Sequence, residues 1–210
     1  MEPGGPDHSL RPALEALAAK DKDLARAYAA CGLPPVRRHP TGFEGLIRII
    51  TAQQVSVASA RAIMGRLEAA VSPLAPDGFL ALDDAAARAV GLSRQKLVYG
   101  RALAQAVVDG GLDLDGLADL DDEAAIAALT QVKGIGRWTA EIYLLFSLQR
   151  PDVFPAGDLA VRASAGRLKG RKKTPDEKQV TRMAARWKPH RSAAARFLWH
   201  AYRHPGLPEG

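Results

Sequence analysis

The stretch Gln131–Ser164, QVKGIGRWTAEIYLLFSLQRPDVFPAGDLAVRAS, decides the fold of this chain. Its two glycines, Gly134 and Gly136, flank Ile135 between segments whose apolar residues recur at helical spacing. Glycine tolerates positive φ and has no side chain to hold a ligand away, so the turn can bring backbone N–H groups against an anion. A lone acid, Asp158, follows in a short loop bounded by proline and glycine. The stretch predicts a helical hairpin with a carboxylate downstream.

The start of the second hairpin helix has the features of a phosphate-binding site, which we call the phosphate seat. This helix is expected to begin at Arg137–Thr139, so its unpaired N–H groups and the positive end of its dipole face outward. Lys133 and Arg137 add positive charge, and the apolar Ile135 is expected to dip into the core. The alternative is an ordinary corner between two helices with a glycine cap. The basic neighbours and the downstream acid favour the phosphate seat.

The rest of the chain is also predicted to be helical. Helices are expected at 10–30, 43–70, 79–89, 94–109, 121–131, about 138–147, 158–167, 175–187 and 191–202. The second should break near Gln53–Ser56, where polar residues interrupt it and β-branched neighbours lower its helix propensity. No segment alternates with the period of a strand, so the predicted fold class is all-α. Residues 1–9, rich in proline and glycine, are predicted to be a flexible leader.

The composition and net charge of the chain limit which classes of protein it can belong to. The chain has 210 residues and a net charge of +6, which favours a polyanionic partner. One cysteine, Cys31, excludes an internal disulfide framework and a four-cysteine iron–sulfur cluster. No apolar run approaches the ~18 residues of a membrane span, and the first residues lack the pattern of a signal peptide. The expected location is the bacterial cytoplasm, without membrane attachment.

The motif VKGIGRWTA followed by VFPAGDLAVR resembles the helix-hairpin-helix glycosylase superfamily, and most closely its DNA-3-methyladenine glycosylase II (AlkA-type) branch. The resemblance extends over about 43–202. It implies two helical lobes around a DNA-binding cleft, without the N-terminal β domain of the longer AlkA-type relatives. Within a glycosylase domain at 10–210, one lobe is expected to hold about 43–136 and the other about 10–42 with 137–204.

The resemblance also assigns roles to the hairpin. Its backbone amides, from Lys133 through Gly134, Ile135 and Gly136 to Arg137 and Thr139, would hold a DNA phosphate beside the lesion. The carbonyls of Thr130, Val132 and Ile135 would bind Na⁺ or K⁺, as an optional aid and not a required cofactor.

Asp158 occupies the position of the essential catalytic acid in the family that the chain resembles. Breaking an N-glycosidic bond passes through an oxocarbenium-like sugar, which a nearby carboxylate stabilises while it orients or deprotonates water. From the residues alone, Asp158 is also a good N-cap for the following helix. The two roles are compatible, because a cap at the mouth of a cleft aims its carboxylate.

Trp138 stands where bifunctional relatives carry a lysine that attacks C1′ of the sugar. Tryptophan cannot form a Schiff base, and Lys133 lies five residues upstream on another part of the hairpin, so the resemblance implies water as the nucleophile and no lyase activity. Trp138 and Trp199 would line the base pocket, where an aromatic ring can stack on an alkylated base. For Trp199 a core position is equally compatible with its spacing. Ile142 replaces a pocket tyrosine of the nearest relatives.

The run Gln53-Gln54-Val55-Ser56 interrupts an apolar helix. A base-flipping enzyme must fill the space left in the duplex, and the nearest relatives place a leucine wedge at the position of Gln54. Gln53, Gln54 and Ser56 are therefore expected to contact DNA. A solvated helix bend is the alternative for Gln53 and Ser56.

Together these features predict a monomeric, monofunctional DNA glycosylase of base excision repair. It would hydrolyse the N-glycosidic bond of alkylated purines of the 3-methyladenine type in double-stranded DNA and leave an abasic site. The alternatives are a glycosylase for oxidised or deaminated bases and a non-catalytic hairpin module that only holds DNA. Asp158 and the tryptophan pair argue against the second. The basic run at 166–173 is expected to be a solvated loop, with contact to flanking phosphates as a secondary hypothesis.

Overall fold

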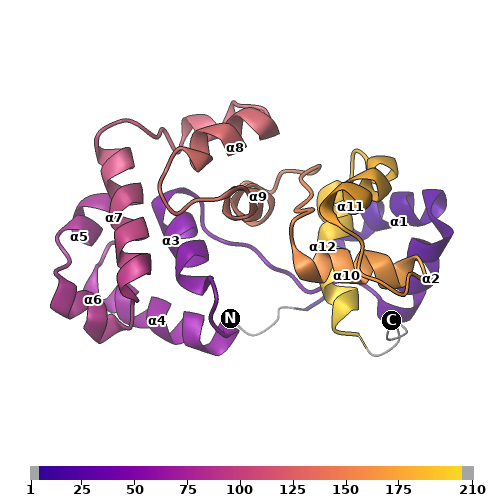
Figure 1. Cartoon of the computed structure of the whole chain (residues 1–210), viewed down its shortest axis with the longest axis horizontal. Coiled ribbons are helices and arrows are strands. Elements are labelled where there is room, and N and C mark those ends of the chain that lie inside the picture. The colour runs from indigo at the N-terminus through magenta and orange to yellow at the C-terminus, as the bar shows by residue number, and fades with distance from the viewer. Residues whose placement is uncertain (1–4, 205–210) are drawn as a thin grey trace. The chain divides into compact units, whose positions relative to one another are not determined.

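A computed structural model describes residues 5–204, and over this range every regular element is helical (Figure 1). An isolated bridge between Pro6 and Pro35 is the sole β-type pairing among the described residues. The all-α prediction is confirmed. None of the helices formed by residues 5–204 is long and apolar enough to cross a membrane.

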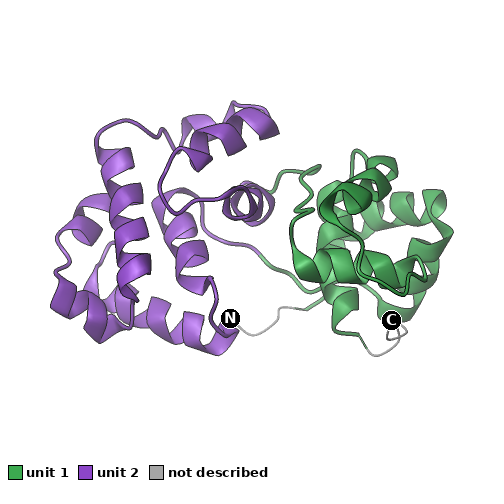
Figure 2. Cartoon of the chain, in the orientation of Figure 1, with its two compact units in different colours: residues 1–37, 149–210 green, residues 38–148 purple. Residues whose placement is uncertain are grey.

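The chain forms two compact units (Figure 2). Unit 1 combines residues 1–37 with 149–210, and unit 2 is the continuous segment 38–148. The division differs from the expected lobes in the place of residues 38–42 and 137–148, which belong to unit 2. For 137–148 the reason is packing, because the helix in this segment contacts two other helices of unit 2.

Unit 2 is built around one central helix. Its elements are α3 (Gly42–Ala52), α4 (Val57–Ala70), α5 (Pro76–Leu80), α6 (Asp84–Val90), α7 (Arg94–Val108), η2 (Gly116–Ala118), α8 (Asp122–Thr130) and α9 (Arg137–Phe146). Helix α3 packs against α4, α7 and α9, and buries Leu46, Ile47 and Ile50 among them. The break between α3 and α4 falls where the sequence predicts it. Tyr143 of α9 is fully buried, and its hydroxyl accepts a 2.8 Å hydrogen bond from the N–H of Gly42, which fixes α9 to the start of α3.

Unit 1 combines helices from the N-terminal and the C-terminal parts of the described chain. Its elements are η1 (His8–Leu10), α1 (Arg11–Lys20), α2 (Lys22–Cys31), α10 (Leu159–Leu168), α11 (Glu177–Ala184), η3 (Ala185–Trp187) and α12 (Arg191–Tyr202). Helix α12 packs against α10, α1 and α2, and most of its residues from Ser192 to Leu198 are buried. Residues more than 140 positions apart therefore share one core.

A buried acid divides what the sequence predicts as a single helix at 10–30. The side chain of Asp21 accepts hydrogen bonds from the N–H groups of Asp23 and Leu24 and so caps α2, while the backbone of Asp21 is extended. The same carboxylate accepts bonds from Lys169 Nζ at 2.6 Å and from Trp187 Nε1 at 3.0 Å. Asp21 thereby joins the α1–α2 corner to α10 and η3.

The predicted flexible leader is wrong for residues 5–9, and residues 1–4 lie outside the described part of the chain. Asp7 is 2% exposed, and its N–H donates to the carbonyl of Pro34 at 2.8 Å. Its carboxylate accepts a 2.6 Å hydrogen bond from Arg196 Nη2 of α12. A buried, hydrogen-bonded ion pair holds this segment in place, and composition alone did not indicate it.

Candidate functional site

The turn between α8 and α9 depends on two glycines that differ in conformation. Gly134 has φ +93°, and a Cβ atom at this position would overlap the ring of Tyr99. Gly136 has φ −87°, and a Cβ there would meet no described atom within 4 Å. Ile135 between them is 3% exposed and anchors the turn in the core of unit 2, as the sequence predicts. Gly134 therefore serves the packing of the turn, while Gly136 keeps space open in front of it.

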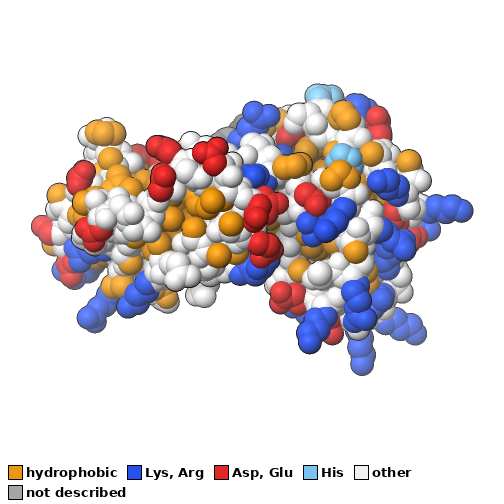
Figure 3. All heavy atoms as spheres, turned by 90° about the horizontal axis from the view of Figure 1, so that it is seen from above, with side chains coloured by type: hydrophobic (Ala, Val, Ile, Leu, Met, Phe, Trp, Pro, Cys, Tyr) orange, Lys and Arg blue, Asp and Glu red, His pale blue; other side chains and the backbone are white. Residues whose placement is uncertain are grey.

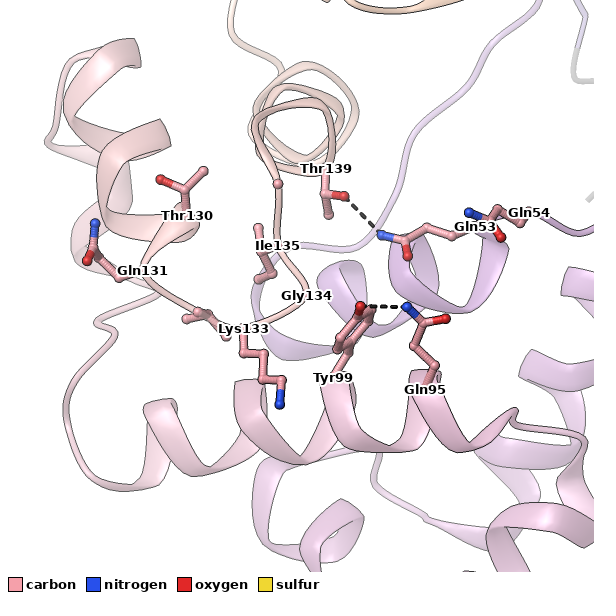
Figure 4. Close-up of a pocket in the computed structure, with 12 residues that line it drawn as sticks. Gln53, Gln54, Gln95, Tyr99, Thr130, Gln131, Lys133, Gly134, Ile135 and Thr139 are labelled. Atoms are coloured by element: carbon pink, nitrogen blue, oxygen red, sulfur yellow. Dashed lines mark hydrogen bonds between the residues drawn. The ribbon is translucent and has the colours of Figure 1, made fainter.

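A groove of about 600 Å³ lies beside this turn (Figure 4). It is lined by residues 130–136, by Thr139, by Gln53 and Gln54, and by Gln95 and Tyr99 of α7. Gln95 and Tyr99 are not predicted from the sequence, because nothing in their local pattern shows that α7 contributes to this groove. The Tyr99 hydroxyl accepts a 2.6 Å hydrogen bond from Gln95 Nε2. The groove is thus a polar surface within unit 2.

Helix α9 opens onto this groove with its N-terminus. Its N-cap is Gly136, which has no side chain to satisfy the first-turn N–H groups. Thr139 is 3% exposed, and its hydroxyl accepts a 3.0 Å hydrogen bond from Gln53 Nε2. Gln53 therefore ties the end of α3 to the first turn of α9, as Figure 4 shows. The positive end of the α9 dipole is held in a fixed place at the groove.

The structure corrects one part of the expectation for Arg137, which is that its side chain adds free positive charge at the groove. Its Nη1 and Nη2 atoms bind Glu123 at 3.0 and 2.6 Å, and its Nε atom binds Glu141 at 3.0 Å. The hydrogen bonds with Glu123 raise the pKa of Arg137, and two carboxylates balance its charge. Arg137 does not line the groove. Lys133 does, is exposed and forms no ion pair with any residue in 5–204.

The turn between α3 and α4 presents Gln54. This residue is exposed and has φ +54°, a left-handed conformation that costs energy for any residue other than glycine. Ser56 caps α4, because its hydroxyl accepts a 3.1 Å hydrogen bond from the N–H of Ser59, and its contact with DNA stays a prediction. The turn is also held from α7, where Lys96 Nζ donates to the carbonyl of Thr51 at 2.7 Å. Gln54 is thus strained and exposed at a rigid turn.

Asp158 is held in unit 1 by two hydrogen bonds to one carboxylate oxygen. Its Oδ1 atom accepts from the N–H of Val161 at 2.9 Å, which makes Asp158 the N-cap of α10. The same oxygen accepts from the indole Nε1 of Trp199 at 3.0 Å. The loop before Asp158 is anchored by Val153, whose N–H donates to Ser192 Oγ at 2.9 Å. The position of this carboxylate is therefore set from both α10 and α12.

Trp138 and Trp199, the two predicted pocket residues, differ in their burial and in their contacts. Trp199 on α12 is half-buried and orients Asp158, so it is not simply a core residue. Trp138 is the second residue of α9 and is 38% exposed, although tryptophan usually has most of its surface buried. Ile142, one turn later, is 4% exposed and belongs to the core of unit 2. Unit 1 thus brings Trp199 together with Asp158, and unit 2 brings the hairpin together with Gln53 and Gln54.

Comparison with known proteins gives consistent matches. Residues 47–190 match the family described as HhH-GPD superfamily base excision DNA repair protein. The chain is 36% identical over 161 residues to DNA-3-methyladenine glycosylase 1 of Schizosaccharomyces pombe, covering 75% of this chain and 71% of that protein. It is 33% identical over 170 residues to DNA-3-methyladenine glycosylase 2 of Escherichia coli, covering 75% and 57%.

Solved structures agree with these matches. A Schizosaccharomyces pombe 3-methyladenine DNA glycosylase in complex with abasic DNA superposes with a TM-score of 0.82 at 33% identity, over 90% of this chain and 95% of that one. A DNA-3-methyladenine glycosidase from Bacillus halodurans gives a TM-score of 0.78 at 31% identity, over 91% and 89%.

Proposed function

The chain belongs to the HhH-GPD superfamily of base excision DNA repair proteins, and from this premise we propose that it is a monofunctional DNA glycosylase for alkylated purines of the 3-methyladenine type. The names of its relatives support the substrate class. The observation that carries the proposal is Asp158, which is half-buried and fixed by Val161 and Trp199 at the start of α10. A DNA clamp without chemistry needs the N-cap of α10, but it does not need a tryptophan indole to orient the same carboxylate.

The reaction is hydrolysis of the bond between C1′ of the sugar and the purine nitrogen. The bond breaks with its electron pair going to the base, so a positively charged alkylated purine leaves as a neutral base and needs no acid to protonate it. The sugar is left as an oxocarbenium-like cation, which the Asp158 carboxylate stabilises. A water oxygen then bonds to C1′, and its proton passes to Asp158. One carboxylate therefore suffices for both steps.

The hairpin supplies the contact with the DNA backbone in this proposal. The uncapped N-terminus of α9 and the open space at Gly136 suit a phosphate oxygen, and Lys133 adds charge at the same groove. Gln54, exposed on its rigid turn, is assigned to the space left by the flipped base. Trp138 and Trp199 are assigned to the base pocket, and a single chain carries all of these residues, so we infer a monomer.

The hairpin carbonyls are compatible with a monovalent cation. Thr130, Val132 and Ile135 line the same groove, and their neutral oxygens are suitable ligands for Na⁺ or K⁺. The Val132 carbonyl already accepts the N–H of Ile135 at 3.0 Å, which leaves it one lone pair for an ion. A bound cation would add positive charge beside the phosphate, and Asp158 performs the chemistry with or without it.

The test is base release from synthetic duplexes that each contain one lesion: 3-methyladenine, 7-methylguanine, hypoxanthine or 8-oxoguanine. We expect release of the alkylated purines and strand breaks only after alkali. Breaks without alkali would contradict the assignment of water as the nucleophile. Release of only the oxidised or deaminated base would contradict the substrate class, and tight duplex binding with no release would leave a DNA-binding module.

A further inference from the structure

Loop 169–176, α11 and η3 carry exposed cations that the hairpin mechanism does not use. Residues 170–186 contain six Lys or Arg against two acids. These six side chains are exposed and form no ion pair with any residue in 5–204; we call them the cationic strip, which consists of Arg171, Lys172, Lys173, Lys178, Arg182 and Arg186. Lys169, just before the strip, is instead paired with Asp21 and Asp23.

The strip belongs to a unit with a strong excess of positive charge. Unit 1 has 19 Lys and Arg against 10 Asp and Glu, a net charge of +9. Unit 2 has 10 against 13, a net charge of −3, although it contains the hairpin. Lys and Arg side chains crowd the face of unit 1 that Figure 3 shows. The net charge of +6 is therefore not spread over the molecule but concentrated in one unit.

The first three cations line a groove on a loop whose two ends are hydrogen-bonded to α10. The groove has a volume of about 460 Å³ and is lined by residues 171–174, Asp176 and Gln179. Gly170, with φ +62°, reverses the chain after α10, and the N–H of Arg171 donates to the carbonyl of Gly166 at 2.9 Å. The Asp176 carboxylate is engaged with the N–H of Gln179 at 2.7 Å in a capping box. The loop that carries the three cations is thus hydrogen-bonded at its start and is followed directly by a capped helix.

The groove adjoins the Asp158 segment of the same unit. Arg162, in the first turn of α10, donates from Nε to the carbonyl of Pro175 at 2.9 Å. On the other side, the space a Cβ would fill at Gly157 lies 3.9 Å from Glu177 Oε2 at the start of α11. The loop that carries the cations is therefore fastened to the helix that Asp158 caps.

Helix α11 continues the strip with regular spacing. Lys178 and Arg182 lie four residues apart on one face of α11, while Val180 and Ala184 are buried on the other, and Arg186 follows in η3. An eight-residue helix is about 12 Å long, which corresponds to roughly three to four phosphates along one strand of B-form DNA. The spacing suits a polyanion with regularly repeated charges.

We propose that the cationic strip is a second DNA-binding site, which holds the sugar–phosphate backbone of the duplex outside the lesion. The inference rests on the proposed function, since the partner is the same DNA that Asp158 acts on. The strip has no built-in base recognition, because it offers charges and no side chains fixed for reading base edges. Its contribution is to affinity and to the rate of encounter with DNA.

The experiment measures duplex affinity against salt for the wild-type chain and for the triple variant R171A/K172A/K173A, with an undamaged 25-base-pair duplex. Loss of three phosphate contacts lowers the slope of log K against log[salt] by about 2.7. Between 50 and 200 mM salt, the wild type should therefore lose about 40-fold more affinity than the variant. The variant R171K/K172R/K173R keeps the charges and should keep the wild-type slope.

The matched control is R11A/K20A/K22A, which removes the same charge from α1 and α2 of unit 1. An equal change of slope in both triple variants, or none in the strip variant, overturns the proposal. So does a strip variant that loses binding to RNA or to an acidic polypeptide but keeps its DNA slope. Base release by the wild type reports separately on the proposed function, so the two ideas can fail independently.

Discussion

Replacing the two hairpin glycines with alanine should affect different properties: Gly134→Ala should lower stability, and Gly136→Ala should weaken DNA binding. At Gly134, φ is +93°, and a non-glycine residue in this region costs about 1–2 kcal/mol. The added Cβ also overlaps the Tyr99 ring, which costs a further ~1–3 kcal/mol as in other overpacked sites. Gly134→Ala should therefore lower the free energy of unfolding by about 2–5 kcal/mol.

At Gly136 the same substitution is compatible with the fold. Its φ of −87° and ψ of 171° are ordinary for alanine, and a Cβ would meet no described atom within 4 Å. Stability should change by no more than about 1 kcal/mol, in the stabilising direction. The methyl group would, however, stand where a phosphate approaches the first N–H groups of α9. Loss of one hydrogen bond to a charged group, about 1.5–3 kcal/mol, weakens duplex binding about 10- to 100-fold.

Urea denaturation and fluorescence anisotropy with a duplex measure the two effects. The double variant Tyr99→Ala/Gly134→Ala is the control, since it removes the overlap with the ring. It should recover the part of the stability loss that comes from the overlap and keep the part that comes from the positive φ. A Gly134→Ala protein as stable as the wild type would refute the geometry of the turn. A Gly136→Ala protein that is folded and binds duplex normally would refute the phosphate seat.

Three further predictions concern single side chains. Asp158→Asn keeps the cap on α10 and the acceptor for Trp199, so it should be as stable as the wild type but release alkylated base about 10²- to 10³-fold more slowly. Asp158→Ala should in addition lose about 1 kcal/mol of stability, because it removes the cap. If Asp158→Asn released base as fast as the wild type, Asp158 would serve only as the cap. Burial raises the pKa of the Asp21 carboxyl, but hydrogen bonds from Lys169 and Trp187 outweigh this effect and hold the pKa below its ordinary value. The stability that Asp21 contributes is therefore fully present above the ordinary carboxyl range and is lost as pH falls through the lowered pKa. Asp21→Asn should therefore cost about 3 kcal/mol at pH 7 and flatten the loss of stability below pH 4 in urea titrations, and an unchanged acid limb would contradict this. Gln54→Gly should raise stability by up to about 1 kcal/mol, because glycine adopts a φ of +54° without strain. The same variant should slow single-turnover base release. A variant that gains stability without losing rate would show that Gln54 does not fill the space left by the flipped base.

Much of the helical framework follows from local patterns. The break at 53–56, the hairpin and the cap at Asp158 were all predicted, because each depends on residues within about four positions along the chain. The single helix predicted at 10–30 failed for the opposite reason. Its break at Asp21 is fixed by Lys169 and Trp187, which lie over 140 residues away, and no local signal reports such partners.

The candidate site shows the same limit. The motif placed charge at Arg137, but only the folded hairpin shows that Glu123 and Glu141 take up that charge. Likewise, Tyr99 becomes part of the turn through its contact with Gly134, which is 35 residues away in sequence. Residue type and spacing therefore predict which chemistry is present, whereas the partners of each charged group depend on packing between distant helices.

The two DNA contacts proposed for this chain differ in kind. The hairpin belongs to a unit of net charge −3 and offers backbone N–H groups with one exposed lysine, Lys133, so its attraction is short-ranged and depends on geometry. The cationic strip offers six full charges, whose attraction reaches over about a Debye length and weakens with salt. Gly136→Ala should therefore lower affinity with an unchanged salt slope, while the triple strip variant should change the slope itself. If both variants changed the slope equally, the division between a positioning contact and an attracting one would be wrong.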